Sequence, residues 1–296
     1  MEFHVLFSLF DRRQPKLMHE LPLVGLEEIA KLERYALERR ARAGARNAYL
    51  GNGVTLCRIM GRYKLYVSSD DVGFGAHVVL DGIWEPWMPG FMARAIKLGM
   101  YVADVGANHG YYTVLMGELV GPGGRVAAIE PHPRTCALLR QSVSINGYAG
   151  WTDVIECAVG GLVGEVLTLH TPINEPKNAH VVHGGVAEGA MTVRSERLAD
   201  LLAGWPKIDF IKMDVEGAEE AALSGAAPMI ERDRPMILLE YNIHRCENPE
   251  GLLTWLTTLY GPLKELDLDG LLKPVTREQL MDRARVEDWM LFCDVG

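Results

Sequence analysis

Residues 104–113, DVGANHGYYT, combine an acid, two glycines and a renewed apolar pattern, which is typical of a ligand-binding turn. Residues 100–105, apolar except for Asp104, predict a buried strand before the turn, and a helical pattern follows the turn. Glycine at Gly106 and Gly110 permits a backbone shape that brings main-chain groups close to a ligand. The carboxylate of Asp104, just before the turn, favours a ligand that carries positive charge there.

A phosphate does not suit this turn. Dinucleotide-binding turns follow G-x-G-x-x-G and direct amide groups at a pyrophosphate. Here Asp104 would repel a phosphate, and the turn holds no lysine or arginine. S-adenosylmethionine fits better, because it carries a sulfonium, an ammonium and a ribose. We predict that Asp104 reaches the ammonium, directly or through water, and that Glu130 accepts hydrogen bonds from both ribose hydroxyls. The alternative is a plain tight turn in which Asn108 caps the following helix.

Five acids fall at or near the carboxyl ends of predicted strands, namely Asp104, Glu130, Glu156, Asp214 and Glu240. Ligands of parallel sheets bind beyond these ends, so we expect the five carboxylates to gather at one edge. Methyl transfer to a hydroxyl needs alignment of the reactants and removal of the hydroxyl proton.

Two schemes for the proton are open. Asp214 and Glu240 would hold a divalent ion such as Mg²⁺ that lowers the pKa of the acceptor hydroxyl. Alternatively, His244 would accept the proton without a metal, and we favour this scheme. Asp214 has a structural alternative, which is to cap the helix that begins near Gly217, with Glu216 on the turn between them. For Lys212 we expect a structural or solvated role.

The elements that must position these residues alternate between strands and helices. Repeated strand–helix units predict an α/β fold with a mainly parallel sheet and helices on both faces. The predicted strands are 100–105, 125–130, 152–159, 208–215, 235–241 and 289–295, and the predicted helices are 111–120, 133–147, 217–226 and 249–261. Residues 165–170 and 190–195 predict a hairpin around a long excursion, 171–189. Such loops often cover binding sites, and this one carries His180 and His183.

The first 90 residues read as a small appendage before a larger domain, 91–296. Apolar residues at helical spacing predict one helix over 26–43, whose stripe packs on the main domain or in a homodimer. Residues 53–71 predict a small β-meander. Residues 82–90 predict a turn-rich bridge in which Trp84 and Trp87 pack, or stack on a sugar ring or base.

Composition limits the partners. The net charge of −9 argues against nucleic-acid binding. The five cysteines show no zinc-like spacing and read as reduced thiols of a cytoplasmic protein. No stretch is long and apolar enough to predict a membrane span.

Several motifs together resemble the FkbM-type S-adenosylmethionine-dependent methyltransferases. They are DVGANHGYYT, AIEPHP, ECAVG and IKMDVEGAEEAALSGA, followed by PMILLEYN. The resemblance covers about residues 70–296 and implies a class I Rossmann-like fold with a seven-stranded sheet. It places the methionine portion of the cofactor at Asp104, Gly106, Asn108, Gly110 and Thr113, the ribose at Glu130, and the adenine at Cys157 and Ala158. We also expect Ala107, Pro131 and Asp214 to bind the cofactor.

The resemblance also implies O-methylation of a hydroxyl on a sugar, glycan or other natural product. Two alternatives remain open: an N-methyltransferase of a small molecule, and a non-catalytic partner subunit that binds S-adenosylmethionine. A dehydrogenase is disfavoured by the acid before the glycine turn. His109, within that turn, is expected to point outward.

Overall fold

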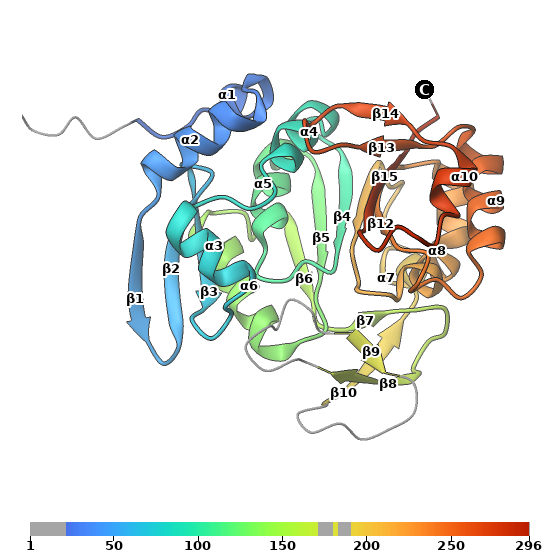
Figure 1. Ribbon diagram of the computed structural model, residues 1–296. Coiled ribbons are helices and arrows are strands. Elements are labelled where there is room, and N and C mark those ends of the chain that lie inside the picture. Colours follow the sequence, from blue (N-terminus) through green and yellow to red (C-terminus); the bar gives the residue numbers. More distant parts are fainter. Residues whose placement is uncertain (1–21, 171–179, 183–190, 296) are drawn as a thin grey trace, which may run out of the picture.

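The computed structural model describes residues 22–170, 180–182 and 191–295, and its centre is an eight-stranded sheet (Figure 1). Across the sheet, the strands are β14 (Leu272–Pro274), β13 (Lys264–Leu266), β15 (Trp289–Cys293), β12 (Met236–Tyr241), β11 (Phe210–Met213), β4 (Tyr101–Val105), β5 (Arg125–Ile129) and β6 (Thr152–Ile155). Strands β6, β5, β4, β11 and β12 are parallel neighbours, and β15, β13 and β14 join by antiparallel pairing.

This sheet confirms the predicted Rossmann-like α/β class. It has one strand more than the seven expected, because the three-residue strand β14 forms a hairpin with β13. A strand of three residues is too short to show the alternation of apolar and polar residues by which a strand is predicted from sequence. The chain order reverses at β4, which pairs with β5 on one side and with β11 on the other. At such a point the loops after neighbouring strands diverge and leave a crevice for a ligand.

The apolar side chains of the central strands alternate between two core clusters, one on each face. Val102 and Phe210 belong to the first cluster, while Ala103 and Ile211 belong to the second. The first cluster includes α4 (Trp87–Ala95), α5 (Tyr111–Val120) and the N-terminal elements, and α6 (Pro133–Ile145) lies on the same face. The second includes α7 (Leu198–Leu201), α8 (Glu219–Asp233), α9 (Pro249–Tyr260) and α10 (Arg277–Leu280). Helices therefore cover both faces, as predicted.

The N-terminal region contains two helices instead of the single helix expected over 26–43. Helix α1 (Leu26–Lys31) ends where Leu32 and Glu33 adopt extended backbone angles, and α2 (Arg34–Gly44) begins directly afterwards. Ile29, Leu37 and Ala41 are fully buried within the chain itself. The stripe therefore packs within the chain, α1 against α4 and α2 against α3 and β2, in a core cluster that also includes residues of the main domain. A homodimer through this region stays a prediction.

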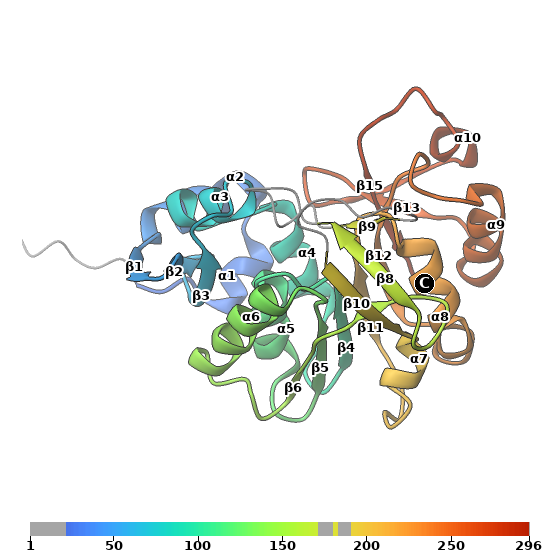
Figure 2. The ribbon, with the colours of Figure 1, turned by 90° about the horizontal axis from the view of Figure 1, so that it is seen from below.

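The meander predicted over 53–71 is confirmed for β2 (Val54–Ile59) and β3 (Tyr63–Ser68), which pair antiparallel, and β1 (Asn47–Gly51), before the predicted range, adds a third antiparallel strand. Helix α3 (Phe74–Asp81) follows it. Figure 2 shows these elements on the opposite side of the molecule from α9 and α10. Arg62, after β2, forms an ion pair with Glu118 of α5, and Tyr66 donates its amide to Ser142 of α6 at 3.0 Å. The N-terminal sheet is thus attached to the helices beside the glycine turn.

The predicted domain boundary at 90/91 falls inside α4, and one core cluster contains residues from both parts. The bridge expected over 82–90 is helical from Trp87 onward. Division into 1–90 and 91–296 stays a prediction about organisation, while the packing of the two parts is continuous.

A second sheet, in the order β7-β10-β8-β9, lies beyond the carboxyl ends of the central strands (Figure 1). The single strand expected over 152–159 is divided between β6 and β7 (Ala158–Val159) of different sheets. The predicted hairpin is confirmed, because β8 (Val166–His170) pairs antiparallel with β10 (Met191–Glu196). Within the excursion only β9 (His180–Val182) is described, so His183 and the predicted covering loop lie outside the described residues.

No helix among the described residues is long and apolar enough to span a membrane.

Burial of Leu37 predicts the contribution of the N-terminal region to stability. Leu37→Ala should lower the free energy of unfolding by about 2–5 kcal/mol, since it leaves a cavity in the core. Leu80→Ala, on α3, is the matched control because Leu80 is 76% exposed, and its effect should stay within about 0.5 kcal/mol. Urea unfolding measures both, and equal losses would contradict the packing described for α2.

Candidate functional site

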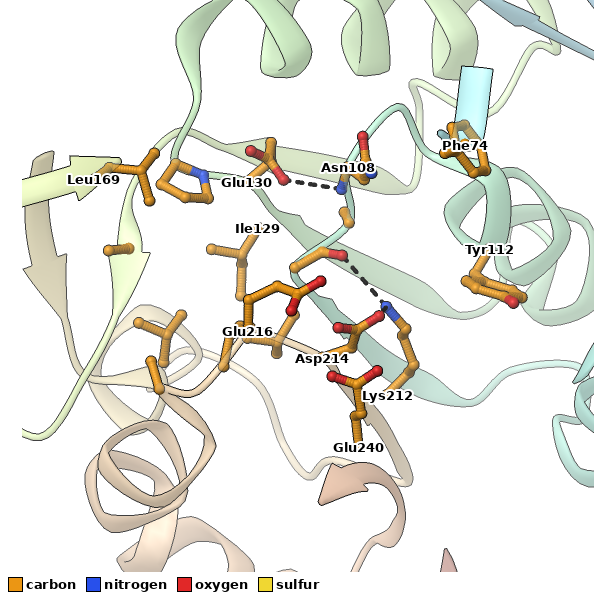
Figure 3. Close-up of a pocket in the computed structure, with 18 of the residues that line it drawn as sticks. Phe74, Asn108, Tyr112, Ile129, Glu130, Leu169, Lys212, Asp214, Glu216 and Glu240 are labelled. Atoms are coloured by element: carbon orange, nitrogen blue, oxygen red, sulfur yellow. Dashed lines mark hydrogen bonds and ion pairs between the residues drawn. The ribbon is translucent and has the colours of Figure 1, made fainter. Parts of the chain in front are cut away.

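A cavity of about 340 Å³ opens at the carboxyl ends of the central strands, where the chain order reverses (Figure 3). Phe74 and Tyr112 border one side, Leu169 of the small sheet borders the other, and a group of acids lies between them. The lining residues are Phe74, Trp84, Glu85, Val105, Gly106, Ala107, Asn108, Tyr112, Ile129, Glu130, Pro131, Cys157, Ala158, Val159, Leu169, Lys212, Asp214, Val215, Glu216, Ala218, Glu240 and Asp288.

The glycine turn lies against the end of β11. A Cβ atom on Gly106 would lie 1.8 Å from the carbonyl oxygen of Asp214, and the φ of Gly106 is +77°. Both constraints require glycine here. The amides of Gly106 and Ala107 donate to the carbonyl of Ile129, at 3.0 and 2.9 Å. Gly110, with φ +92°, then turns the chain into α5. The turn is therefore fixed between the ends of β5 and β11.

Asp104 has a different role from the one expected. Its carboxylate is fully buried, accepts a hydrogen bond from Thr113 at 2.6 Å and lies 3.8 Å from the ammonium of Lys212. Neither Asp104 nor Thr113 nor Gly110 lines the cavity. The direct contact predicted between Asp104 and a cofactor ammonium is thus not supported, because residue 104 precedes the last residue of β4 and faces the interior.

Lys212 links the two strand ends. Its ammonium lies 3.1 Å from Asp214, donates to the carbonyl of Gly106 at 3.3 Å and lies 5.3 Å from the centre of the Tyr112 ring. Burial by itself would lower the pKa of Lys212, but Asp214 and Asp104 outweigh it and raise the pKa. Lys212 is therefore a charged structural residue and not a solvated one.

Glu130, after β5, holds the other side of the turn. One carboxylate oxygen accepts from the amide of Asn108 at 2.9 Å (Figure 3). The other accepts from the amide of His132, also at 2.9 Å. Burial raises the pKa of Glu130 to about 7, although these two amides oppose the shift. Pro131, Cys157 and Ala158 line the cavity beyond it, and the assignment of Cys157 and Ala158 to an adenine stays a prediction. The prediction that Glu156 joins the other acids is wrong, since its exposed side chain pairs with Arg140.

The acids at the opposite end form a compact group. Carboxylate oxygens of Asp214, Glu216 and Glu240 lie within 4.8 Å of one another. Arg245 bridges the group, with nitrogen–oxygen distances of 2.7 Å to Glu216 and 2.8 Å to Glu240. Burial, together with neighbouring acids, raises the pKa of Glu216 to about 7 and that of Glu240 further. The group has the donor chemistry of a hard cation site, but the guanidinium of Arg245 already occupies oxygens of two of its members.

His244 does not reach the cavity. It is exposed, and its ring nitrogen Nε2 lies 3.2 Å from the carbonyl oxygen of Arg285. The preceding Ile243 is buried, which turns the next side chain outward. The assignment of His244 as the base is therefore not supported.

His109 is also placed differently, because it is fully buried rather than outward. Its ring stacks on Phe74 with centroids 5.6 Å apart, and its Nε2 accepts the amide of Ser68 at 3.2 Å. Burial lowers the pKa of His109 to about 3, so the ring is neutral.

The sequence did not identify Phe74, Tyr112, Arg245 or Asp288 as site residues; the aromatic pair in GYYT was the one available signal.

Residues 104–261, more than half of the chain, match the family described as "Methyltransferase FkbM domain". The chain belongs to this methyltransferase family. Protein-L-isoaspartate O-methyltransferase of Aeropyrum pernix is 40% identical over 97 residues, which are 31% of this chain and 35% of that protein. Methyltransferase sdnD of Sordaria araneosa is 25% identical over 158 residues, 42% of this chain and 60% of that protein. The chain thus spans about a third to three fifths of these curated relatives.

Among solved structures, the methyltransferase FkbM of Methylobacillus flagellatus covers 65% of this chain and 43% of its own, with 18% identity and a TM-score of 0.41. Members of the FkbM family use S-adenosylmethionine, and the residues present fit that cofactor. Glu130 offers carboxylate oxygens at a strand end, where they suit the ribose. Gly106, Ala107 and Asn108 line the cavity, so the backbone of the turn is open to a ligand there. At Gly106 no Cβ atom fits.

Cofactor affinity should depend on Glu130. Glu130→Ala should weaken S-adenosylmethionine binding by about 1.5–3 kcal/mol for each charge-assisted hydrogen bond lost. Glu156→Ala is the matched control, because Glu156 is a strand-end acid outside the cavity. Calorimetry measures the affinity of both variants. Unchanged affinity of Glu130→Ala would contradict the assignment of Glu130 to the ribose.

The raised pKa of Glu130 predicts a pH dependence of stability. The folded protein holds this proton up to about pH 7, and the ordinary pKa is 4.5. The resulting stabilisation is complete below the ordinary pKa and is lost as the pH rises through the folded one. Glutamine cannot ionise, so Glu130→Gln should gain stability relative to wild type between about pH 5 and about pH 8. Urea unfolding of the cofactor-free proteins tests this; a pH-independent difference would contradict it.

Proposed function

We propose that the protein is an S-adenosylmethionine-dependent O-methyltransferase whose acceptor is a hydroxyl of a sugar or other natural product. The observation that carries the proposal is one continuous cavity with two chemically distinct ends. Glu130, Cys157 and Ala158 line the end suited to a nucleoside, and the acids after β11 and β12 line the other. A methyl donor bound at the first end would present its methionine portion toward those acids.

Oxygen is the preferred acceptor atom for two reasons. A hydroxyl must lose its proton during transfer, and carboxylates at the acceptor end supply acceptors for it. The isoaspartate methyltransferase relative carries O-methylation in its name, and its similarity supports the same atom here. An N-methyltransferase of a small molecule remains the second candidate, because negative charge also suits an amine.

Asp214 and Glu240 are the strand-end acids proposed to orient the acceptor. Asp214 has a second role through Lys212, which lies between it and Asp104. We favour metal-free proton removal, since Arg245 already supplies positive charge to Glu216 and Glu240. Elements of residues 22–90 are proposed to form the acceptor-facing wall, because Phe74, Trp84 and Glu85 line the cavity.

The proposed activity is tested by incubating the protein with methyl-labelled S-adenosylmethionine and sugar-bearing extracts. We expect a labelled product whose added methyl group is on oxygen by mass spectrometry. Label on nitrogen would favour the second candidate, and cofactor binding without any label would favour a non-catalytic subunit.

Metal dependence is tested in the same reaction. EDTA should leave the labelling rate unchanged, because the proposed proton removal uses side chains alone. Asp214→Asn should lower that rate with or without EDTA. A rate abolished by EDTA and restored by Mg²⁺ would instead establish the metal scheme.

A further inference from the structure

The main cavity, at the strand ends, has a wall at Trp84 and Glu85 that comes from outside the residues that match the family, 104–261. Two consecutive tyrosines at the start of α5 hold this wall. The hydroxyl of Tyr111 accepts the amide of Trp84 and donates to its carbonyl, both at 3.0 Å. The hydroxyl of Tyr112 donates to the carboxylate of Glu85. Helix α5 thus fixes the position of the wall.

A second cavity, of about 350 Å³, shares this wall. Trp84 and Glu85 line both cavities, so the two lie next to each other. The volume falls within the range of small-molecule sites, about 300–1,000 Å³. The side chains that α2, α3 and the start of α4 contribute to it are Glu38, Arg42, His77, Asp81 and Trp87. All of them precede the matching segment, so the second cavity is distinct from the residues assigned to the cofactor.

Two half-buried tryptophans border the second cavity. The ring of Trp84 contacts Phe74, with centroids 5.7 Å apart, and His77, with centroids 5.3 Å apart. The guanidinium of Arg34 lies 5.0 Å from the centre of the Trp87 ring. These contacts set the direction of both indoles. Large aromatic side chains offer a broad apolar surface, and the C–H groups on one face of a sugar ring pack well on such a surface.

The polar side chains of the second cavity form one bridged set. The guanidinium of Arg42 lies 2.9 Å from the carboxylate of Glu38 and 3.3 Å from that of Asp81. A guanidinium carries five donors and each carboxylate accepts several hydrogen bonds, so the set can bind further groups. Hydroxyl groups both donate and accept, and a ligand with several of them suits this mixture. Two acids beside one arginine disfavour a phosphate or another anion.

We propose that the second cavity binds a neutral sugar unit of the acceptor, next to the unit whose hydroxyl is methylated. The inference rests on the function proposed above, and it narrows the acceptor to a glycan or glycoside of at least two sugar units. Trp84 and Trp87 contact the apolar face of the second unit, and Arg42 with its paired acids binds the hydroxyls. The second cavity thereby adds affinity for the acceptor without contacting the reacting atoms.

The identity of the labelled product is the first test. Wild-type protein transfers label from methyl-labelled S-adenosylmethionine into the sugar-bearing extract, and the purified product is measured by mass before and after acid hydrolysis. We expect at least two linked neutral sugar units before hydrolysis and the label on one released sugar afterwards. A labelled product with a single sugar unit, an anionic second unit or no sugar would overturn the inference, although methyl transfer would be established. Absence of label would contradict the proposed function itself.

Variants of the second cavity provide the second test, in initial rates over a dilution series of the same extract at saturating labelled cofactor. Arg42→Met removes the hydrogen bonds of the guanidinium, and Trp87→Leu removes an aromatic face. Neither residue lines the main cavity. Each variant should raise the extract concentration that gives the half-maximal rate about tenfold and change the maximal rate less than about twofold, because binding remote from the reacting atoms is lost. Trp87→Phe keeps an aromatic face and should shift the half-maximal concentration less than Trp87→Leu.

Arg39→Met is the matched control, because Arg39 is an exposed arginine of α2 that lines neither cavity. Its dilution curve should equal that of wild type. Cofactor affinity, measured by calorimetry, should stay within about twofold in every variant, which also shows that the variants are folded. An unchanged half-maximal concentration in Arg42→Met and Trp87→Leu, or an effect confined to the maximal rate, would overturn the assignment of the second cavity.

Discussion

The buried ammonium of Lys212 is the interaction on which the site depends. It lies opposite Asp104 in the pairing of β11 with β4, so one side chain joins the two strands where the chain order reverses. The same ammonium holds the carbonyl of Gly106 and the carboxylate of Asp214. Removing one member of such a buried set leaves an uncompensated charge, which costs about 3–5 kcal/mol. The Lys212 ammonium therefore holds the glycine turn and the ends of β4 and β11 together beside the cavity.

Around this connection, each wall of the cavity comes from a different part of the chain. The strand ends provide Glu130 and the acid group, the small sheet provides Leu169, and the N-terminal elements provide Phe74, through the stacking of its ring on His109. Because His109 lies inside the glycine turn and accepts the amide of Ser68 in β3, the N-terminal sheet contacts the turn directly. The N-terminal region is thus built into the wall of the site.

The sequence predicted those features of the site that depend on residues close together in the chain. The turn from Gly106 to Gly110, the strand-end position of Glu130 and the alternation of strands and helices were all readable. The partner of Asp104 was not, because a sequence does not state which strands are neighbours. His109 and His244 were both misplaced for the same reason, since exposure depends on packing by distant segments. The break between α1 and α2 was hidden because apolar spacing continues across the extended residues Leu32 and Glu33.

Tyr111 and Tyr112 follow the glycine turn directly, so the turn and the wall at Trp84 and Glu85 share the first residues of α5. If the proposed function holds, ordering of the turn by the cofactor would also stabilise the wall that faces the acceptor. Thermodynamic linkage makes this effect reciprocal: the factor by which the cofactor tightens acceptor binding equals the factor by which the acceptor tightens cofactor binding. In the proposed function, the adjacent hydroxyl groups of Tyr111 and Tyr112 would thereby link cofactor binding to acceptor binding.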